Sequence, residues 1–161
     1  PWLYQGRVAE AVRQFKYRRR WRLGAWLAET MIEEARASLP LAAIEAVLPV
    51  PRHWLKRRLT GAHPAEVLAR RVALGLGKPY LADGLRRPRW TATQTRRTIP
   101  ERARNVRGAF AATPARVAGT SLLLVDDVLT SGATANACAL ALKAGGARRV
   151  FVLAAARTPL A

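Results

Sequence analysis

An apolar run that ends in two adjacent acids constrains this chain more than any other feature. The run Ser121 to Val125 reads SLLLV, and Asp126 and Asp127 follow it directly. Such a run is typical of a strand that is buried on both faces of a parallel sheet. Because open α/β sheets bind their ligands at the carboxyl ends of the strands, the two acids are predicted to lie at a binding site.

The residues that follow predict a helix and a second strand. An Ala-rich helix is expected from about Ala133 to Ala144, and Gly145 and Gly146 supply its C-terminal stop. Val150 to Leu153 reads as the next buried strand. A strand, a helix and a strand in this order form a βαβ unit, so the chain is predicted to be an α/β protein with a parallel sheet flanked by helices.

The loop between the acids and the helix has the composition of a phosphate site. It reads Thr130, Ser131, Gly132, Ala133 and Thr134. The hydroxyl groups can donate hydrogen bonds, the glycine lets the backbone approach a ligand, and the free N–H groups of a helix N-terminus favour an anion. With the acids beside it, the loop predicts a sugar 5-phosphate as ligand. The simpler alternative is that Asp127 or Ser131 only caps the helix and that Asp126 is a turn residue.

The whole chain, 1–161, is expected to form one domain, with a helical N-terminal part, 1–40, and a core, 44–161. Apolar spacing predicts helices over residues 7–19, 21–37 and 64–76, and a short strand over 44–50. In the second helix, Leu23, Trp26, Leu27 and Met31 form one stripe that is expected to face the core. Residues 83–107 contain eight Arg and are predicted to be a long basic loop.

The charge of the chain indicates an anionic partner. The formal net charge of the 161 residues is +18, from 28 basic and 10 acidic residues. Nucleic acid is one such partner, although an Arg-rich composition also follows from GC-rich coding. Aromatic side chains within basic stretches can stack on the bases of single strands. The candidates for such contacts are Trp54, Arg57, Arg58, Trp90, Arg96 and Arg97; the alternative for both tryptophans is a half-buried packing role.

Several classes of protein are excluded or disfavoured. The single cysteine, Cys138, excludes a disulfide framework and a Cys-based zinc cluster within this chain. No apolar run reaches the roughly 18–20 residues that a membrane-spanning helix needs. A cytoplasmic location is expected, since the single cysteine fits a reducing compartment. His53 and His63 have no metal-ligand spacing, and no protein-held metal site is predicted.

The segment Leu122 to Thr134, LLLVDDVLTSGAT, resembles the phosphoribosyl-pyrophosphate (PRPP) motif of the type I phosphoribosyltransferases. The resemblance implies that Asp126 and Asp127 hold the ribose hydroxyls at the catalytic centre. It also implies that Thr130, Ser131, Gly132, Ala133 and Thr134 hold the 5-phosphate. In that family pyrophosphate is displaced through a transition state with oxocarbenium character, and Mg²⁺ as cofactor neutralises the pyrophosphate.

A narrower resemblance covers most of the chain. The order of Tyr4-x-Gly6, Phe15-Lys16-Tyr17, the LPVP at 48–51, Gly108-Ala109-Phe110 and the PRPP motif is similar to that of the competence protein ComF (GntX-like) family. The resemblance places Pro51 and Arg52 in a pyrophosphate loop. It places Gln94, Arg102 and Asn105 in a mobile loop that closes over PRPP. The N-terminal Cys-rich zinc module of that family is not expected within these 161 residues.

Three functions remain open at this point. The chain is either a Mg²⁺-dependent phosphoribosyltransferase with an unknown acceptor, a single-stranded DNA-binding protein of DNA uptake in natural transformation, or a regulator that senses PRPP. Enzymatic transfer from PRPP is the expected chemistry. The expected partners are PRPP, single-stranded DNA and a competence helicase or uptake machinery.

Overall fold

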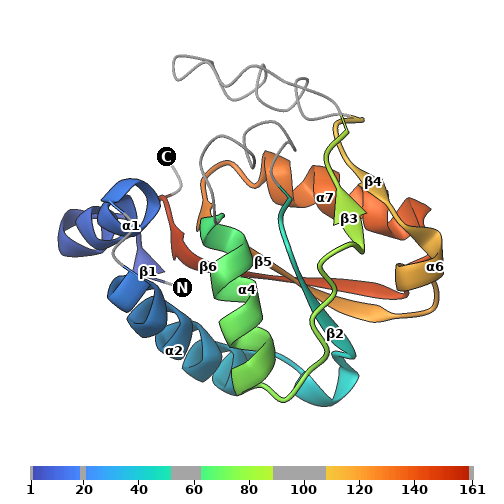
Figure 1. The fold of residues 1–161 in the computed structure, drawn as a ribbon, viewed down its shortest axis with the longest axis horizontal. Helices are drawn as coiled ribbons and strands as arrows, with labels where there is room; N and C mark the ends of the chain where they lie inside the picture. The colour runs from blue at the N-terminus through green and yellow to red at the C-terminus, as the bar shows by residue number, and fades with distance from the viewer. Residues whose placement is uncertain (1, 19–20, 52–62, 89–107, 160–161) are drawn as a thin grey trace.

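The computed structural model describes residues 2–18, 21–51, 63–88 and 108–159, and its main sheet is parallel (Figure 1). In this part of the chain the strand order is β1 (Trp2–Leu3), β6 (Arg149–Arg157), β5 (Ser121–Leu129) and β2 (Ala46–Pro49). β5 therefore lies inside the sheet, and its carboxyl end is next to the carboxyl end of β2. The predicted class, a parallel sheet flanked by helices, is confirmed.

Helices cover both faces of this sheet. The helices α1 (Gly6–Arg18), α2 (Trp21–Ser38) and α4 (Pro64–Gly75) lie on one face, and α7 (Ala133–Ala144) lies on the other (Figure 1). Because side chains of a strand alternate between faces, Leu123 and Val125 pack with the first group of helices, whereas Leu122 and Leu124 pack with α7. All four are fully buried, which explains why the run carries no polar residue.

The predicted helices form where the sequence supplies their start and stop signals. α4 begins at Pro64, since proline has the backbone angle of a helix and lacks the N–H that a first turn leaves unpaired. α7 ends at Ala144, and Gly146 follows with a positive φ of 90°, which glycine adopts without strain. The βαβ unit β5–α7–β6 is present as predicted.

The structure also corrects several sequence-based boundaries. β5 continues through Asp126 and Asp127 to Leu129, because β6 pairs with it as far as Arg157. The segment 83–107 does not begin as a loop, since β3 (Leu85–Arg86) forms an antiparallel pair with β4 (Ala111–Ala112). The short elements η1 (Leu41–Ala43) and α6 (Pro114–Val117) have no periodic sequence pattern, and β1 was not predicted for the same reason.

Trp26 does not face the core as its stripe predicts. Leu27 and Met31 of the same helix are buried, but Trp26 is 40% exposed. Its ring stacks on Trp2, with 6.1 Å between the ring centroids. The prediction is wrong because Trp26 lies at the margin of the buried face of α2, where β1 brings a second tryptophan beside it.

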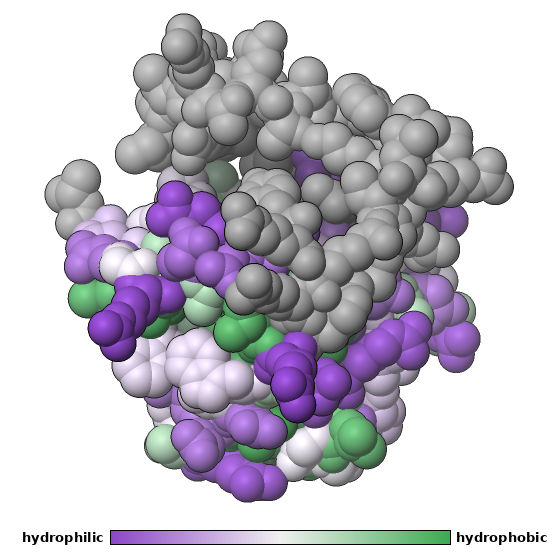
Figure 2. All heavy atoms as spheres, turned by 60° about the vertical axis from the view of Figure 1, so that its left-hand side comes forward, coloured by the Kyte–Doolittle hydropathy of each residue, from purple (hydrophilic) through white to green (hydrophobic). Residues whose placement is uncertain are grey.

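The surface on the side of α1 and α2 is mainly hydrophilic, with small hydrophobic patches between the polar groups (Figure 2). The exposed large apolar side chains of the described residues are Trp2, Leu3, Trp26, Leu74, Leu140 and Val152. None of the described helices combines the length and the apolar character that crossing a membrane requires.

Candidate sugar-phosphate site

The acid pair lies on β5, and its two side chains point to opposite faces of the sheet. Asp126 continues the row of Leu122 and Leu124, which faces α7, and Asp127 continues the row of Leu123 and Val125. Both acids are partly buried. Two adjacent carboxyl groups in such a position are unfavourable unless each has a partner or one keeps its proton.

Lys16 of α1 is the partner of Asp127. Its Nζ atom lies 2.8 Å from Oδ1 of Asp127, and the two side chains are only 24% and 13% exposed. The backbone N–H of Asp127 donates a hydrogen bond of 2.8 Å to Oδ1 of Asp126. The N-terminal helix therefore contributes directly to the acid pair.

The environment of Asp126 raises the pKa of its carboxyl group. Burial and the neighbouring carboxylate of Asp127 raise the pKa of Asp126 to about 8, although the Asp127 N–H and Lys16 act in the opposite direction. At neutral pH Asp126 is therefore mostly protonated. The pair then offers one hydroxyl donor and one ion-paired acceptor, a combination that suits the hydroxyl groups of a sugar.

Two further polar groups lie on the Asp126 side. Burial and the Asp126 carboxyl raise the pKa of the Cys138 thiol in α7, so Cys138 is an uncharged, buried thiol, as its place in the Ala-rich helix predicts. Burial also lowers the pKa of Arg87, whose guanidinium lies 5.3 Å from the centre of the Phe110 ring.

The loop after β5 presents backbone donors. Gly132 immediately precedes α7 and has a positive φ of 74°, and its carbonyl accepts a 2.8 Å hydrogen bond from the N–H of Asn136. No described side chain caps this helix N-terminus, so the alternative of a capping role for Asp127 or Ser131 is wrong. Thr130 and Ser131 are exposed. Free N–H groups at a helix start are favourable neighbours of an anion.

The end of β2 lies beside the acids. Pro49 pairs with Val125, and the N–H of Val50 donates a 2.8 Å hydrogen bond to the carbonyl of Val125. Pro51, the first predicted residue of the pyrophosphate loop, follows directly, so the structure brings it near the acid pair in the sheet. The remaining predicted residues lie outside the described residues: Arg52, Trp54, Arg57, Arg58, Trp90, Gln94, Arg96, Arg97, Arg102 and Asn105.

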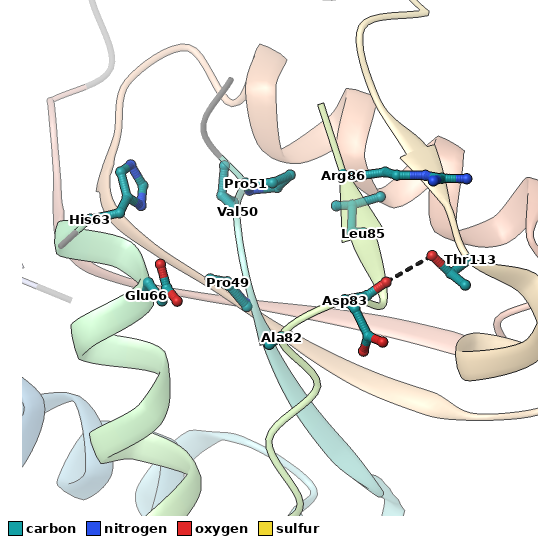
Figure 3. A pocket seen from close by; sticks show the side chains of 10 residues that line it. All are labelled: Pro49, Val50, Pro51, His63, Glu66, Ala82, Asp83, Leu85, Arg86 and Thr113. Carbon is teal, nitrogen blue, oxygen red and sulfur yellow. Dashed lines mark hydrogen bonds between the residues drawn. The ribbon is translucent and has the colours of Figure 1, made fainter. Parts of the chain in front are cut away.

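A pocket of about 400 Å³ adjoins this end of β2 (Figure 3). Pro49, Val50 and Pro51 line it along the strand, and His63 and Glu66 line it from the start of α4. The opposite wall consists of Ala82, Asp83, Leu85, Arg86 and Thr113, where the Thr113 hydroxyl donates a 2.7 Å hydrogen bond to the carbonyl of Asp83 (Figure 3). Acidic and basic side chains thus share a cavity beside the predicted pyrophosphate loop.

Sequence reasoning missed Lys16 as a site residue. The pattern Phe15-Lys16-Tyr17 was visible, and Lys16 is one of only four lysines in the chain. A buried acid needs a cation, but no local spacing identifies which basic residue supplies it. Arg87 and the pocket were missed for the same reason, since both depend on contacts between distant segments. The described residues contain no cluster of three or more His, Cys, Asp or Glu side chains that could hold a metal.

Curated relatives resemble most of this chain. The chain is 33% identical over 154 residues to the DNA utilization protein YhgH of Salmonella typhi. It is 26% identical over 151 residues to Competence protein F of Haemophilus influenzae. Both alignments include 91% of this chain and 66% of the relative, so the chain spans about two thirds of the length of these relatives. No protein-family model matches the chain.

Solved structures share the fold at low sequence identity. The glutamine PRPP amidotransferase of B. subtilis matches 82% of this chain, and 26% of its own chain, with a TM-score of 0.56 and 21% identity. The APRTase of Giardia lamblia matches 78% of this chain, and 64% of its own, with a TM-score of 0.50 and 16% identity. The chain is therefore a homologue of the DNA utilization and competence F proteins, and it has the fold of the type I phosphoribosyltransferases.

Proposed function

We propose that this chain binds PRPP together with Mg²⁺ and acts in the uptake or use of DNA. The observation that carries the proposal is the partly buried acid pair, Asp126 and Asp127, next to a helix N-terminus that no described side chain caps. Such an arrangement provides partners for the hydroxyls of a diol at the acids and for a phosphate at the helix start. The names of the two relatives supply the link to DNA.

In this proposal the ribose hydroxyls bind the acid pair. A protonated Asp126 donates to one hydroxyl oxygen, and Asp127, which Lys16 holds as its ion-pair partner, accepts from the other hydroxyl. The 5-phosphate lies in the loop Thr130–Thr134, where the backbone of Gly132 leaves open space and the first turn of α7 supplies N–H donors.

Mg²⁺ would enter with the diphosphate of PRPP. This ion commonly binds substrate phosphates together with one or two carboxylates and water, and Asp127 is the member of the acid pair that could serve as such a carboxylate. When bound, it supplies charge neutralisation for a leaving pyrophosphate. We further propose that the chain transfers phosphoribose, with an acceptor that enters from the pocket beside Pro51.

Binding of single-stranded DNA is the second part of the proposal. The net charge of +18 favours a polyanion, and exposed basic side chains of the described helices include Arg7 on α1 and Arg70 and Arg71 on α4. The alternative to a transferase is a regulator that binds the same two ligands and senses PRPP while it holds DNA.

Thermal unfolding tests the PRPP site. A ligand of the folded state raises the melting temperature, so PRPP with Mg²⁺ is expected to stabilise the wild-type protein. The double variant Asp126→Asn/Asp127→Asn keeps the size of both side chains and should lose this shift. Glu45→Gln is the control, because Glu45 pairs with Arg148 and with the N–H of Ser121 at the amino end of β5, and it should leave the shift intact. A full shift in the double variant would rule out the site.

A second experiment tests catalysis. Release of pyrophosphate from PRPP in the presence of candidate bases would distinguish an enzyme from a binding protein.

A further inference from the structure

We propose that Lys16 is a ligand-binding residue whose ammonium group contacts the diphosphate end of the sugar phosphate, so that helix α1 forms one wall of the site. This inference rests on the proposed function and deepens it. It assigns a direct contact with the ligand to a residue of the N-terminal helix, far in sequence from the PRPP motif.

The ion pair with Asp127 leaves the ammonium group of Lys16 with N–H donors that can bind a ligand. Asp127 accepts one hydrogen bond from Nζ at 2.8 Å, and an ammonium group has three donors. The Lys16 side chain is 24% exposed, so part of it remains accessible to solvent beside Asp127. A ligand oxygen next to the Asp127 carboxylate would therefore lie within reach of the same ammonium group.

The two faces of β5 separate Lys16 from the 5-phosphate loop. Asp126 faces α7, whose first turn belongs to that loop, whereas Asp127 and Lys16 lie on the face of α1, α2 and α4. A ribose that lies on the acid pair has its 5-phosphate at one end and its C1 substituent at the other. When the 5-phosphate occupies the loop, the C1 diphosphate extends away from α7. Lys16 is the described basic residue that contacts the acid pair from that side.

The charge of the ligand requires a cation at this place. A diphosphate brings several negative charges toward a pair of acids, which repel it. Lysine is a common phosphate ligand that acts as a compact point charge with rotatable donors. Since Lys16 neutralises Asp127 and can also face the ligand, it lowers this repulsion and adds an attraction.

Two contacts fix the position of the N-terminal segment 4–16, which carries Lys16. Phe15, its neighbour, is 1% exposed and lies so close to Gly24 of α2 that a Cβ atom at Gly24 would be 2.5 Å from its ring. At the start of the segment, the N–H of Tyr4 donates a 2.7 Å hydrogen bond to the carbonyl of Arg157 at the end of β6. A lysine on such a firmly packed helix is already arranged for binding, which reduces the entropy lost when a ligand binds.

Calorimetric titration with two ligands tests the proposal. PRPP and ribose 5-phosphate, each with Mg²⁺, differ by the diphosphate. Lys16→Met keeps the apolar stem of the side chain and removes the charge. We expect it to weaken PRPP binding by about tenfold or more, and ribose 5-phosphate binding by less than about twofold. Lys16→Arg should restore most of the PRPP affinity. Arg13→Met is the matched control, because it removes one exposed charge from the same helix and should change neither affinity.

The outcomes distinguish this proposal from the proposed function. An equal loss for both ligands would mean that Lys16 only orients Asp127, and an unchanged PRPP affinity would mean that it makes no contact; either result overturns the proposal. If the wild-type protein binds neither ligand, the proposed function itself fails. Melting temperatures of all variants are measured in parallel, and Lys16→Gln replaces Lys16→Met if the latter does not fold.

Discussion

Nζ of Lys16 lies 2.8 Å from Oδ1 of Asp127, although one residue belongs to the first helix and the other to the penultimate strand. This ion pair connects the N-terminal segment to the acid pair of the candidate site. Any change that moves α1 is therefore expected to change the site, and this relationship leads to the first prediction.

Gly24→Ala should weaken PRPP binding from a distance. The new Cβ would lie 2.5 Å from the ring of Phe15, so the ring and the adjacent Lys16 must shift. Overpacking of this kind costs about 1–3 kcal/mol of unfolding free energy. Gly75→Ala is the control, because its Cβ would lie 2.3 Å from Cδ1 of Ile32, in the C-terminal half of α2, whereas Gly24 lies near the start of that helix. Both variants should lose stability, but only Gly24→Ala should lose PRPP affinity. Equal PRPP affinities of the two variants would show that the packing of Phe15 does not affect the site.

The raised pKa of Asp126 predicts a pH-dependent stability. Between the ordinary pKa of an aspartate and about 8, the folded state keeps the proton that the unfolded state releases. The free energy of unfolding therefore decreases as the pH rises through this range, and the slope disappears above the folded-state pKa. One pKa unit corresponds to about 1.4 kcal/mol.

Asp126→Asn should remove this slope. Relative to the wild type, the variant is expected to gain about 1 kcal/mol or more in unfolding free energy between about pH 5 and pH 8. Urea unfolding at several pH values measures the difference. Parallel curves for the wild type and Asp126→Asn would show that Asp126 titrates normally.

Gly132→Ala should damage the phosphate loop more than the fold. Gly132 has a φ of 74°, a conformation that costs an L-residue about 1–2 kcal/mol, while its surroundings leave open space. Gly119→Ala is closely matched, because Gly119 has a φ of 70° and also has open space around it. We expect similar losses of stability in both, measured by urea unfolding. Weaker binding of ribose 5-phosphate is expected for Gly132→Ala alone, and equal binding by both variants would remove the loop from the site.

Single-stranded DNA binding should depend steeply on salt. Contacts between basic side chains and phosphates release counterions, so affinity for an oligothymidine should fall by at least about tenfold between 50 and 200 mM salt. Fluorescence anisotropy at several salt concentrations gives the slope. An affinity that stays constant over this range would exclude charge-driven binding. Repeating the series with PRPP present determines whether the two ligands compete.

Local sequence determined a large part of the fold and of the candidate site. The strand from Ser121, the loop around Gly132 and the helix from Ala133 follow one another in the chain, so their types and order could be predicted from the residues themselves. The helices α1, α2 and α4 were predictable because their apolar residues recur with the period of a helix. The acid pair was recognisable because two of the three aspartates in the chain are adjacent and directly follow the apolar run from Ser121 to Val125.

Tertiary structure alone decided which residues complete the site. Lys16 meets Asp127, Pro51 lies beside the acids, and the short β1 extends the sheet at β6 through contacts between segments that are far apart in the chain. The raised pKa of Asp126 has the same origin, because burial arises only when the helices close over both faces of the sheet. Sequence periodicity indicates which side of a helix or strand is buried, but it does not identify the segment against which that side packs. The chemistry of the acid pair could therefore be anticipated from the sequence, whereas its charge state and its contact with the first helix could not.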